Sequence, residues 1–128
     1  MTHPRLNRFG QATALAALLS FAALTHGWAH AFIDHTDPVV GSAVKQLPAQ
    51  VRLWYTEGLE PAFSRVQVFD DAGRQIDKQD ARLDAKNDHL LLVSLPPGLR
   101  AGTYKVVWQV VSVDTHRTQG SFTFRVEP

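Results

Sequence analysis

The 128-residue chain contains no cysteine. It therefore forms no disulfide and offers no thiolate ligand, which excludes zinc sites of the cysteine type and iron–sulfur clusters. A lipoprotein anchor is excluded as well, because its lipid is carried on a cysteine. Methionine is nearly as scarce, since Met1 is the only one. Any transition metal must be held by histidine, carboxylate or a chain terminus.

Long apolar runs are also missing. The longest, from Ala12 to Leu24, falls short of the roughly 20 residues that cross a hydrocarbon core. Arg5 and Arg8 precede this run, and the small residues Ala29 and Ala31 follow it. A positive start, a short apolar stretch and a small-residue end are typical of a secretory signal. An N-terminal membrane anchor is the alternative, and the shortness of the run disfavours it.

We therefore expect a signal peptide at residues 1–29 and one exported, periplasmic domain at residues 30–128 that is not embedded in a membrane. Cleavage after Ala31 fits the small-residue pattern too, so both cleavage sites remain open. Loss of the signal's two arginines shifts the net charge from +1 to about −1. Nothing in this balance points to nucleic acid.

Runs rich in β-branched and aromatic residues, several of them alternating polar with apolar, predict strands in the second part of the chain. They occupy residues 51–55, 65–69, 89–93, 104–111 and 121–126. Glycine and proline turn signals separate them, and Gly120 is expected to kink the chain before the last strand. Short strands without a long amphipathic helix favour an all-β sandwich or barrel.

Three donor residues suggest a metal site. Cleavage after Ala29 would make His30 the first residue, which offers its α-amine and its imidazole to one ion. Asp114 and His116 are spaced as residues i and i+2, whose side chains leave the same face of an extended segment. Ser112 would share that face. An Asp-x-His tripeptide alone is also a common surface pair, so the prediction depends on His30.

These nitrogen and oxygen donors suit Cu(II) better than other common metals, and zinc is the main competitor. Two further histidines, His35 and His89, are not needed for this donor set. His89 follows a turn signal and is expected at the surface. His35 lies near His30 and beside acidic residues. It is therefore a candidate for a fourth ligand or for a residue that contacts the ligands without binding the metal.

Four aromatic residues of the strands, Trp54, Trp108, Phe122 and Phe124, are expected in the core. Trp108 and Asp114 are an even number of residues apart, which on a regular strand would put both on one face. Because a ligand must lie near the surface, we expect a bend or bulge between them.

Several of these segments resemble the CopC family of bacterial periplasmic copper-binding proteins. The matching segments are His30-Ala31-Phe32, Pro38 with Gly41-Ser42, residues 55–64 (YTEGLEPAFS), Gly102-Thr103-Tyr104 with Trp108, residues 111–116 (VSVDTH) and Gly120-Ser121-Phe122. They extend through the whole of residues 30–128.

The resemblance implies an immunoglobulin-like Greek-key β-sandwich or barrel that holds one Cu(II) per chain through His30, Asp114 and His116. Glu57 matches a family position beside the site and would orient a ligand. Lacking methionine beyond Met1, the chain is similar to the Cu(II)-only members. The implied role is a monomeric, non-enzymatic copper carrier or buffer in copper homeostasis and resistance, with an inner-membrane copper transport protein of the CopD type as a partner.

Two other functions remain open. The first is a copper-dependent oxidase, since a terminal histidine binding through amine and imidazole also occurs in copper monooxygenases. A carboxylate ligand disfavours it, because anionic oxygen stabilises Cu(II) against reduction. The second is a β-sandwich interaction module without a metal.

Overall fold

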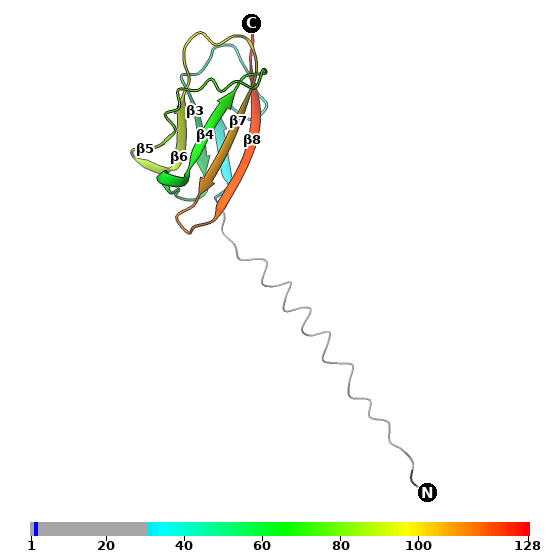
Figure 1. Cartoon of the computed structure of the whole chain (residues 1–128), viewed down its shortest axis with the longest axis vertical. Helices are drawn as coiled ribbons and strands as arrows, with labels where there is room; N and C mark the ends of the chain where they lie inside the picture. Colours follow the sequence, from blue (N-terminus) through cyan, green and yellow to red (C-terminus); the bar gives the residue numbers. More distant parts are fainter. Residues whose placement is uncertain (1, 3–30) are drawn as a thin grey trace.

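The computed structural model describes Thr2 and residues 31–128 as an all-β sandwich of two four-stranded sheets (Figure 1). The first sheet has the order β1-β3-β6-β5, and the second has the order β2-β8-β7-β4. The bounds are β1 Ile33–Asp37, β2 Ala43–Val44, β3 Gln50–Tyr55, β4 Arg65–Phe69, β5 Arg82–Asp84, β6 Asn87–Ser94, β7 Gly102–Val111 and β8 Arg117–Val126, with one 3₁₀ turn, η1, at Pro61–Phe63. All neighbouring strands are antiparallel except β2 and β8.

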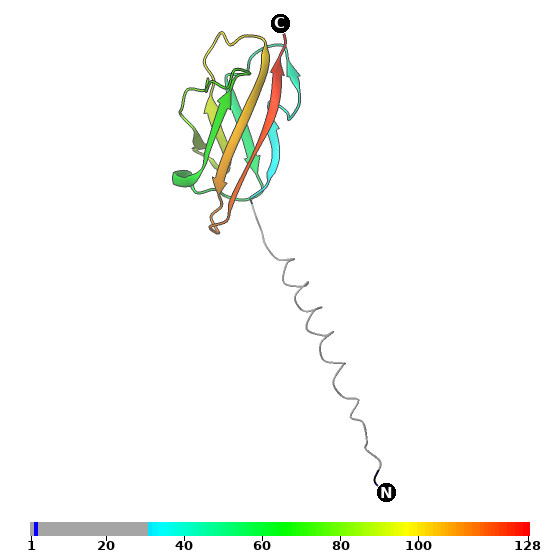
Figure 2. The ribbon, with the colours of Figure 1, turned by 45° about the vertical axis from the view of Figure 1, so that its right-hand side comes forward.

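The chain crosses between the sheets after each of β1, β2, β3 and β4 and again after β6, which gives the sandwich its immunoglobulin-like character. Figures 1 and 2 show the two layers face to face, with the β7–β8 hairpin loop and the start of β1 at one end and the C-terminus at the other. The predicted all-β, immunoglobulin-like fold is confirmed.

The core lies between the sheets and follows from the two-residue period of the strands. Val51, Leu53 and Tyr55 of β3 are buried, and so are Phe122 and Phe124 of β8. Their neighbours in sequence point outward, so each strand has one apolar and one polar face.

Trp54 departs from the expected core. Because Leu53 and Tyr55 point inward, Trp54 points outward, where it stacks on His35 with the ring centroids 4.2 Å apart. The Arg52 guanidinium lies 5.1 Å from the Trp54 ring. Trp108 is half-buried against the core, with its ring edge on Tyr55.

The predicted kink at Gly120 is wrong. Gly120 lies inside β8, directly opposite Trp108 on β7. A Cβ at this position would lie 2.6 Å from Cζ2 of the Trp108 indole. Glycine is therefore needed because the tryptophan ring lies against the backbone, and the strand continues without a break.

The five predicted strands are confirmed, with small shifts at their ends. Three short strands, β1, β2 and β5, were not predicted, because each has few apolar residues and lies at a sheet edge. Within the described residues, no helix is long and apolar enough to span a membrane.

Candidate metal site

Asp114 and His116 lie in the hairpin loop between β7 and β8. The two strands pair without a register shift up to Val111 and Arg117, and the loop then closes through a hydrogen bond from the Ser112 amide to the His116 carbonyl, 2.9 Å long. Thr115 has a positive φ of 73°. The expected change of direction between Trp108 and Asp114 is thus a turn beyond the end of β7.

The prediction that Asp114 and His116 share one face of an extended segment is wrong in its mechanism. The turn brings them together instead, with Nδ1 of His116 3.2 Å from Oδ2 of Asp114. Both side chains are about one-third exposed, at 32% and 38%. The two donors are therefore adjacent and open to solvent.

The hydroxyl of Ser112 donates a hydrogen bond to Oδ1 of Asp114. This bond holds the pKa of the Asp114 carboxyl below its usual value, and the contacts with His116 act in the same direction. Ser112 itself is fully buried. A buried residue thus orients the exposed carboxylate and favours its anionic form.

A second loop, residues 56–60, supports the hairpin loop from the side. The Val113 amide donates to the Gly58 carbonyl over 3.0 Å, and the Glu60 amide donates to the Val111 carbonyl over 2.8 Å. Leu59 also forms a bridge with Ser112. Glu57 belongs to this loop and is half-buried, so its backbone is held next to the hairpin that carries Asp114 and His116.

The first residues of the described chain are attached to the same end of the sandwich. The Ala31 carbonyl accepts a hydrogen bond from the Thr118 hydroxyl, 3.0 Å long, and Ala31 is fully buried. The Phe32 amide donates to the Thr56 hydroxyl over 3.0 Å, and the Thr56 amide donates to the Phe32 carbonyl over 2.9 Å. His30, the third expected ligand, lies outside the described residues.

The other two histidines have partners of their own. His35 contacts Asp34, with Nδ1 2.7 Å from Oδ2, in addition to its stack on Trp54. His89 is half-buried, and its Nδ1 lies 3.2 Å from the Tyr55 carbonyl. Among residues 31–128, no group of three or more histidine and carboxylate side chains is placed to hold a metal, so neither histidine joins Asp114 and His116 there.

Thr118 is the residue of this region that sequence reasoning missed. Its role depends on contact with Ala31, 87 positions earlier in the chain. No local spacing signals such a contact. Ser112 was expected to share a strand face with Asp114; in the folded chain it is buried and contacts Asp114 through the turn instead.

The chain is similar in sequence to curated bacterial proteins along most of its length. Protein YobA of Escherichia coli (strain K12) is 35% identical over 114 residues, which cover 89% of this chain and 92% of that protein. Copper resistance protein C of Pseudomonas syringae pv. tomato is 34% identical over 127 residues, which cover 95% and 98% of the two chains.

Similarity extends to a solved structure and to a family model. The crystal structure of CopC from Methylosinus trichosporium OB3b matches with a TM-score of 0.71 and 30% identity, covering 77% of this chain and 95% of that one. The CopC domain model matches residues 33–127. The chain therefore belongs to the CopC family.

Proposed function

We propose that this protein is a periplasmic copper carrier or buffer that acts in copper homeostasis and resistance. It binds one Cu(II) through the amine and imidazole of His30, the carboxylate of Asp114 and the imidazole of His116. Copper is its cargo, and the protein performs no catalysis.

The observation that carries this proposal is the hydrogen bond from Thr118 to Ala31. Ala31 is the residue after His30, and Thr118 is two positions beyond His116 on β8. Consecutive Cα atoms are 3.8 Å apart, so the Cα of a terminal His30 would lie only that far from the Cα of Ala31, the residue that this hydrogen bond attaches to β8. The contact supports a site to which both the beginning of the domain and the β7–β8 hairpin loop supply ligands.

The spacing of the two described donors also fits one ion. Nitrogen and oxygen ligands lie about 2.0 to 2.2 Å from a divalent ion such as zinc, which puts neighbouring ligands of a square plane roughly 2.9 Å apart. The observed separation of 3.2 Å between His116 Nδ1 and Asp114 Oδ2 needs only a small adjustment.

The donor set supports Cu(II) over Cu(I). Cu(I) favours thiolate and thioether ligands, and the chain offers no cysteine and no methionine beyond Met1. The anionic Asp114 adds a hard oxygen, which stabilises the higher charge. The name of the Pseudomonas syringae relative, copper resistance protein C, agrees with copper as the ion.

Glu57 is proposed as a positioning residue. Its loop is hydrogen-bonded to the hairpin at Val113 and to the first residues of the domain at Phe32. A carboxylate here would orient the His30 amine or a ligating group. Copper would pass to or from an inner-membrane transport protein of the CopD type, with the carrier acting as a monomer.

The intact native mass of the exported protein, measured with and without one equivalent of Cu(II), tests the proposal. We expect a mass that begins at His30 and gains one copper ion. A mass that begins at Phe32 would remove the terminal histidine and contradict the ligand set. Oxygen consumption by the copper-loaded protein with a reductant, abolished by His116→Ala, would instead identify an oxidase.

A further inference from the structure

The two sheets carry opposite charge. In the described part of the chain, the strands of the second sheet contain four cationic residues and no aspartate or glutamate. The cationic residues are Arg65, Lys105, Arg117 and Arg125. The strands of the first sheet contain four aspartates and only two arginines. A nearly neutral protein therefore has one distinctly positive sheet.

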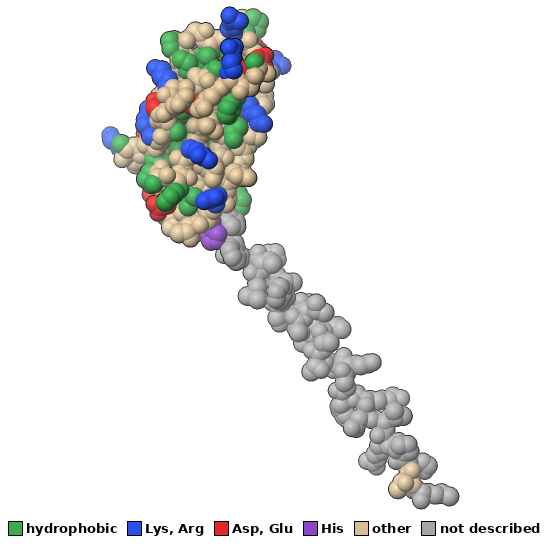
Figure 3. Space-filling model, in the orientation of Figure 1, with side chains coloured by type: hydrophobic (Ala, Val, Ile, Leu, Met, Phe, Trp, Pro, Cys, Tyr) green, Lys and Arg blue, Asp and Glu red, His purple; other side chains and the backbone are tan. Residues whose placement is uncertain are grey.

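All four cations lie on the outer surface of the second sheet, because they alternate with core residues along their strands. Lys105 lies between the buried Tyr104 and Val106, and Arg125 lies between the buried Phe124 and Val126. All four cationic residues are exposed. We call the outward side chains of β4, β7 and β8 the basic face. Figure 3 shows Lys and Arg spread across this view and acidic side chains toward its margins.

The cations are dispersed along the sheet. Arg117 and Arg125 are at opposite ends of β8, eight residues or roughly 27 Å apart. Arg65 pairs with Gln109 and Lys105 pairs with Phe69, so these two lie in different rows across β4 and β7. Such spacing does not converge on one small anion. It suits an extended surface that carries many mobile anionic groups, because one such group can move next to each cation.

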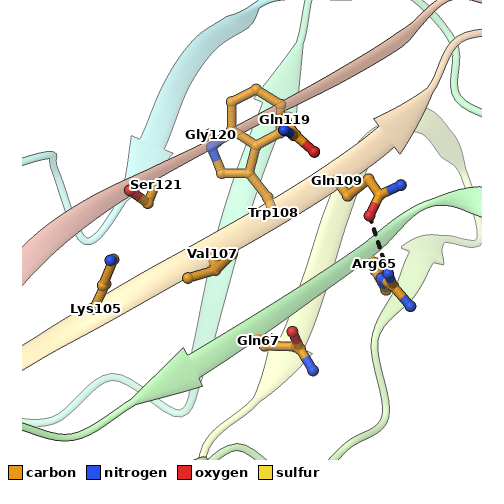
Figure 4. A pocket seen from close by; sticks show the side chains of 9 residues that line it. All are labelled: Arg65, Gln67, Lys105, Val107, Trp108, Gln109, Gln119, Gly120 and Ser121. Atoms are coloured by element: carbon orange, nitrogen blue, oxygen red, sulfur yellow. Dashed lines mark hydrogen bonds between the residues drawn. The ribbon is translucent and has the colours of Figure 1, made fainter. Parts of the chain in front are cut away.

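Between the cations the basic face is shallow, with polar side chains around the apolar Val107 and Trp108. Gln67, Gln109, Gln119 and Ser121 line a hollow of about 390 Å³, shown in Figure 4, and Arg65 donates to the Gln109 side chain over 3.0 Å. The large apolar side chains exposed in residues 31–128 all belong to other segments. Stable protein interfaces are usually anchored by large aromatic residues, whereas the two aromatic residues at this face, Phe69 and Trp108, are half-buried in the sheet.

We propose that the basic face binds the anionic phospholipid headgroups of a membrane surface. The contact is electrostatic and peripheral, without insertion of apolar side chains. Arg117 is next to His116, so the hairpin loop that carries the candidate metal ligands lies at one edge of this face. Membrane association is independent of the proposed copper site and is tested without copper.

The experiment is co-sedimentation with vesicles. The full chain is expressed in a Gram-negative host, and the folded, processed product is purified. It is mixed with vesicles of phosphatidylcholine alone or of equal parts phosphatidylcholine and phosphatidylglycerol, at about 0.01 M and about 0.5 M salt. We expect binding only to the phosphatidylglycerol vesicles and only at low salt, where the Debye length is about 30 Å.

A charge-matched pair of variants locates the surface. Arg65→Gln, Lys105→Gln and Arg125→Gln together remove three cations from the basic face, and the partition coefficient should fall roughly 100-fold, at roughly fivefold for each cation. The control removes three exposed cations of the loops and turns, Lys78→Gln, Lys86→Gln and Arg100→Gln, and should retain most of the binding.

Three outcomes would overturn the proposal. The unaltered protein could fail to bind the anionic vesicles, and an acidic protein would then be the better candidate partner for this face. Both triple variants could lose binding equally, which would assign the effect to net charge alone. The face variant could bind as well as the unaltered protein, which would place the contact elsewhere. Melting curves of both variants confirm that each is folded.

Discussion

The hydroxyl of Thr118 donates a hydrogen bond to the carbonyl of Ala31 over 3.0 Å, joining residues 87 positions apart. This bond attaches the beginning of the domain to β8 beside the hairpin loop of Asp114 and His116. If His30 is a copper ligand, the bond sets the distance between the two halves of the site.

Thr118→Val is therefore expected to weaken Cu(II) binding several-fold. Valine keeps the shape of threonine but cannot donate, so the buried Ala31 carbonyl loses its partner and stability falls by about 1 to 3 kcal/mol. Competition with a Cu(II) chelator measures the affinity, and urea denaturation measures the stability. Thr123→Val, an exposed position on the same strand, is the control. If Thr118→Val is destabilised but binds Cu(II) with unchanged affinity, the Thr118–Ala31 hydrogen bond does not position the copper ligands.

Asp114→Ala and His116→Ala should each weaken Cu(II) binding more than tenfold, because each removes one of the proposed ligands. The same chelator competition measures both. Asp88 and His89 form a matched pair at the start of β6, with His89 Nε2 3.6 Å from Asp88 Oδ1. Asp88→Ala and His89→Ala should leave the affinity unchanged. Equal losses in the two pairs would contradict the assignment of Asp114 and His116.

Gly120→Ala should destabilise the domain by about 1 to 3 kcal/mol, the usual cost of overpacking. The added methyl group would lie 2.6 Å from the Trp108 indole. Thermal denaturation should show a fall of several degrees in Tm. Ser121→Ala, at the next and exposed position, should change little. In a Trp108→Leu background the effect of Gly120→Ala should shrink, and an undiminished effect there would contradict the steric cause.

Asp70 should make stability depend on pH. Its carboxylate accepts hydrogen bonds from the Arg74 amide, 2.9 Å long, and the Ala72 amide, 3.0 Å long. The Arg74 amide is the main reason that the pKa of Asp70 lies below its usual value, and the Arg74 guanidinium adds to the effect. The carboxylate thus contributes stability above the unfolded-state pKa, near 3.9, and this contribution is lost as pH falls through the lower folded-state pKa.

Asp70→Asn keeps an acceptor oxygen but removes the charge. It should lower the urea midpoint at pH 7, and the difference from the unaltered protein should shrink as the pH falls below the unfolded-state pKa. Asp71→Asn makes the same change of charge at the adjacent exposed residue and should have little effect at pH 7 or in acid. A difference for Asp70→Asn that does not shrink in acid would show that lost charge is not the cause.

The strands were largely predictable, and their packing faces less so. In β3 and β8 the alternation of polar and apolar residues predicted both the strands and the residues that point inward, because the side chains of a strand alternate between its two faces. The same rule places Trp54 outside, yet its aromatic character led to the opposite prediction. Gly120 was misread because a glycine that accommodates a tryptophan ring has the same sequence signal as one that bends the chain.

The sequence by itself determined the all-β sandwich, the CopC family pattern and the kinds of donor available, since these depend on local periodicity and composition. Only the tertiary structure decided how Asp114 and His116 meet, because a turn with a positive φ at Thr115 replaces the extended segment that their spacing suggested. It also decided the Ala31–Thr118 contact and the gathering of four cations on one sheet face. These depend on which strands become neighbours, and no local pattern encodes strand order.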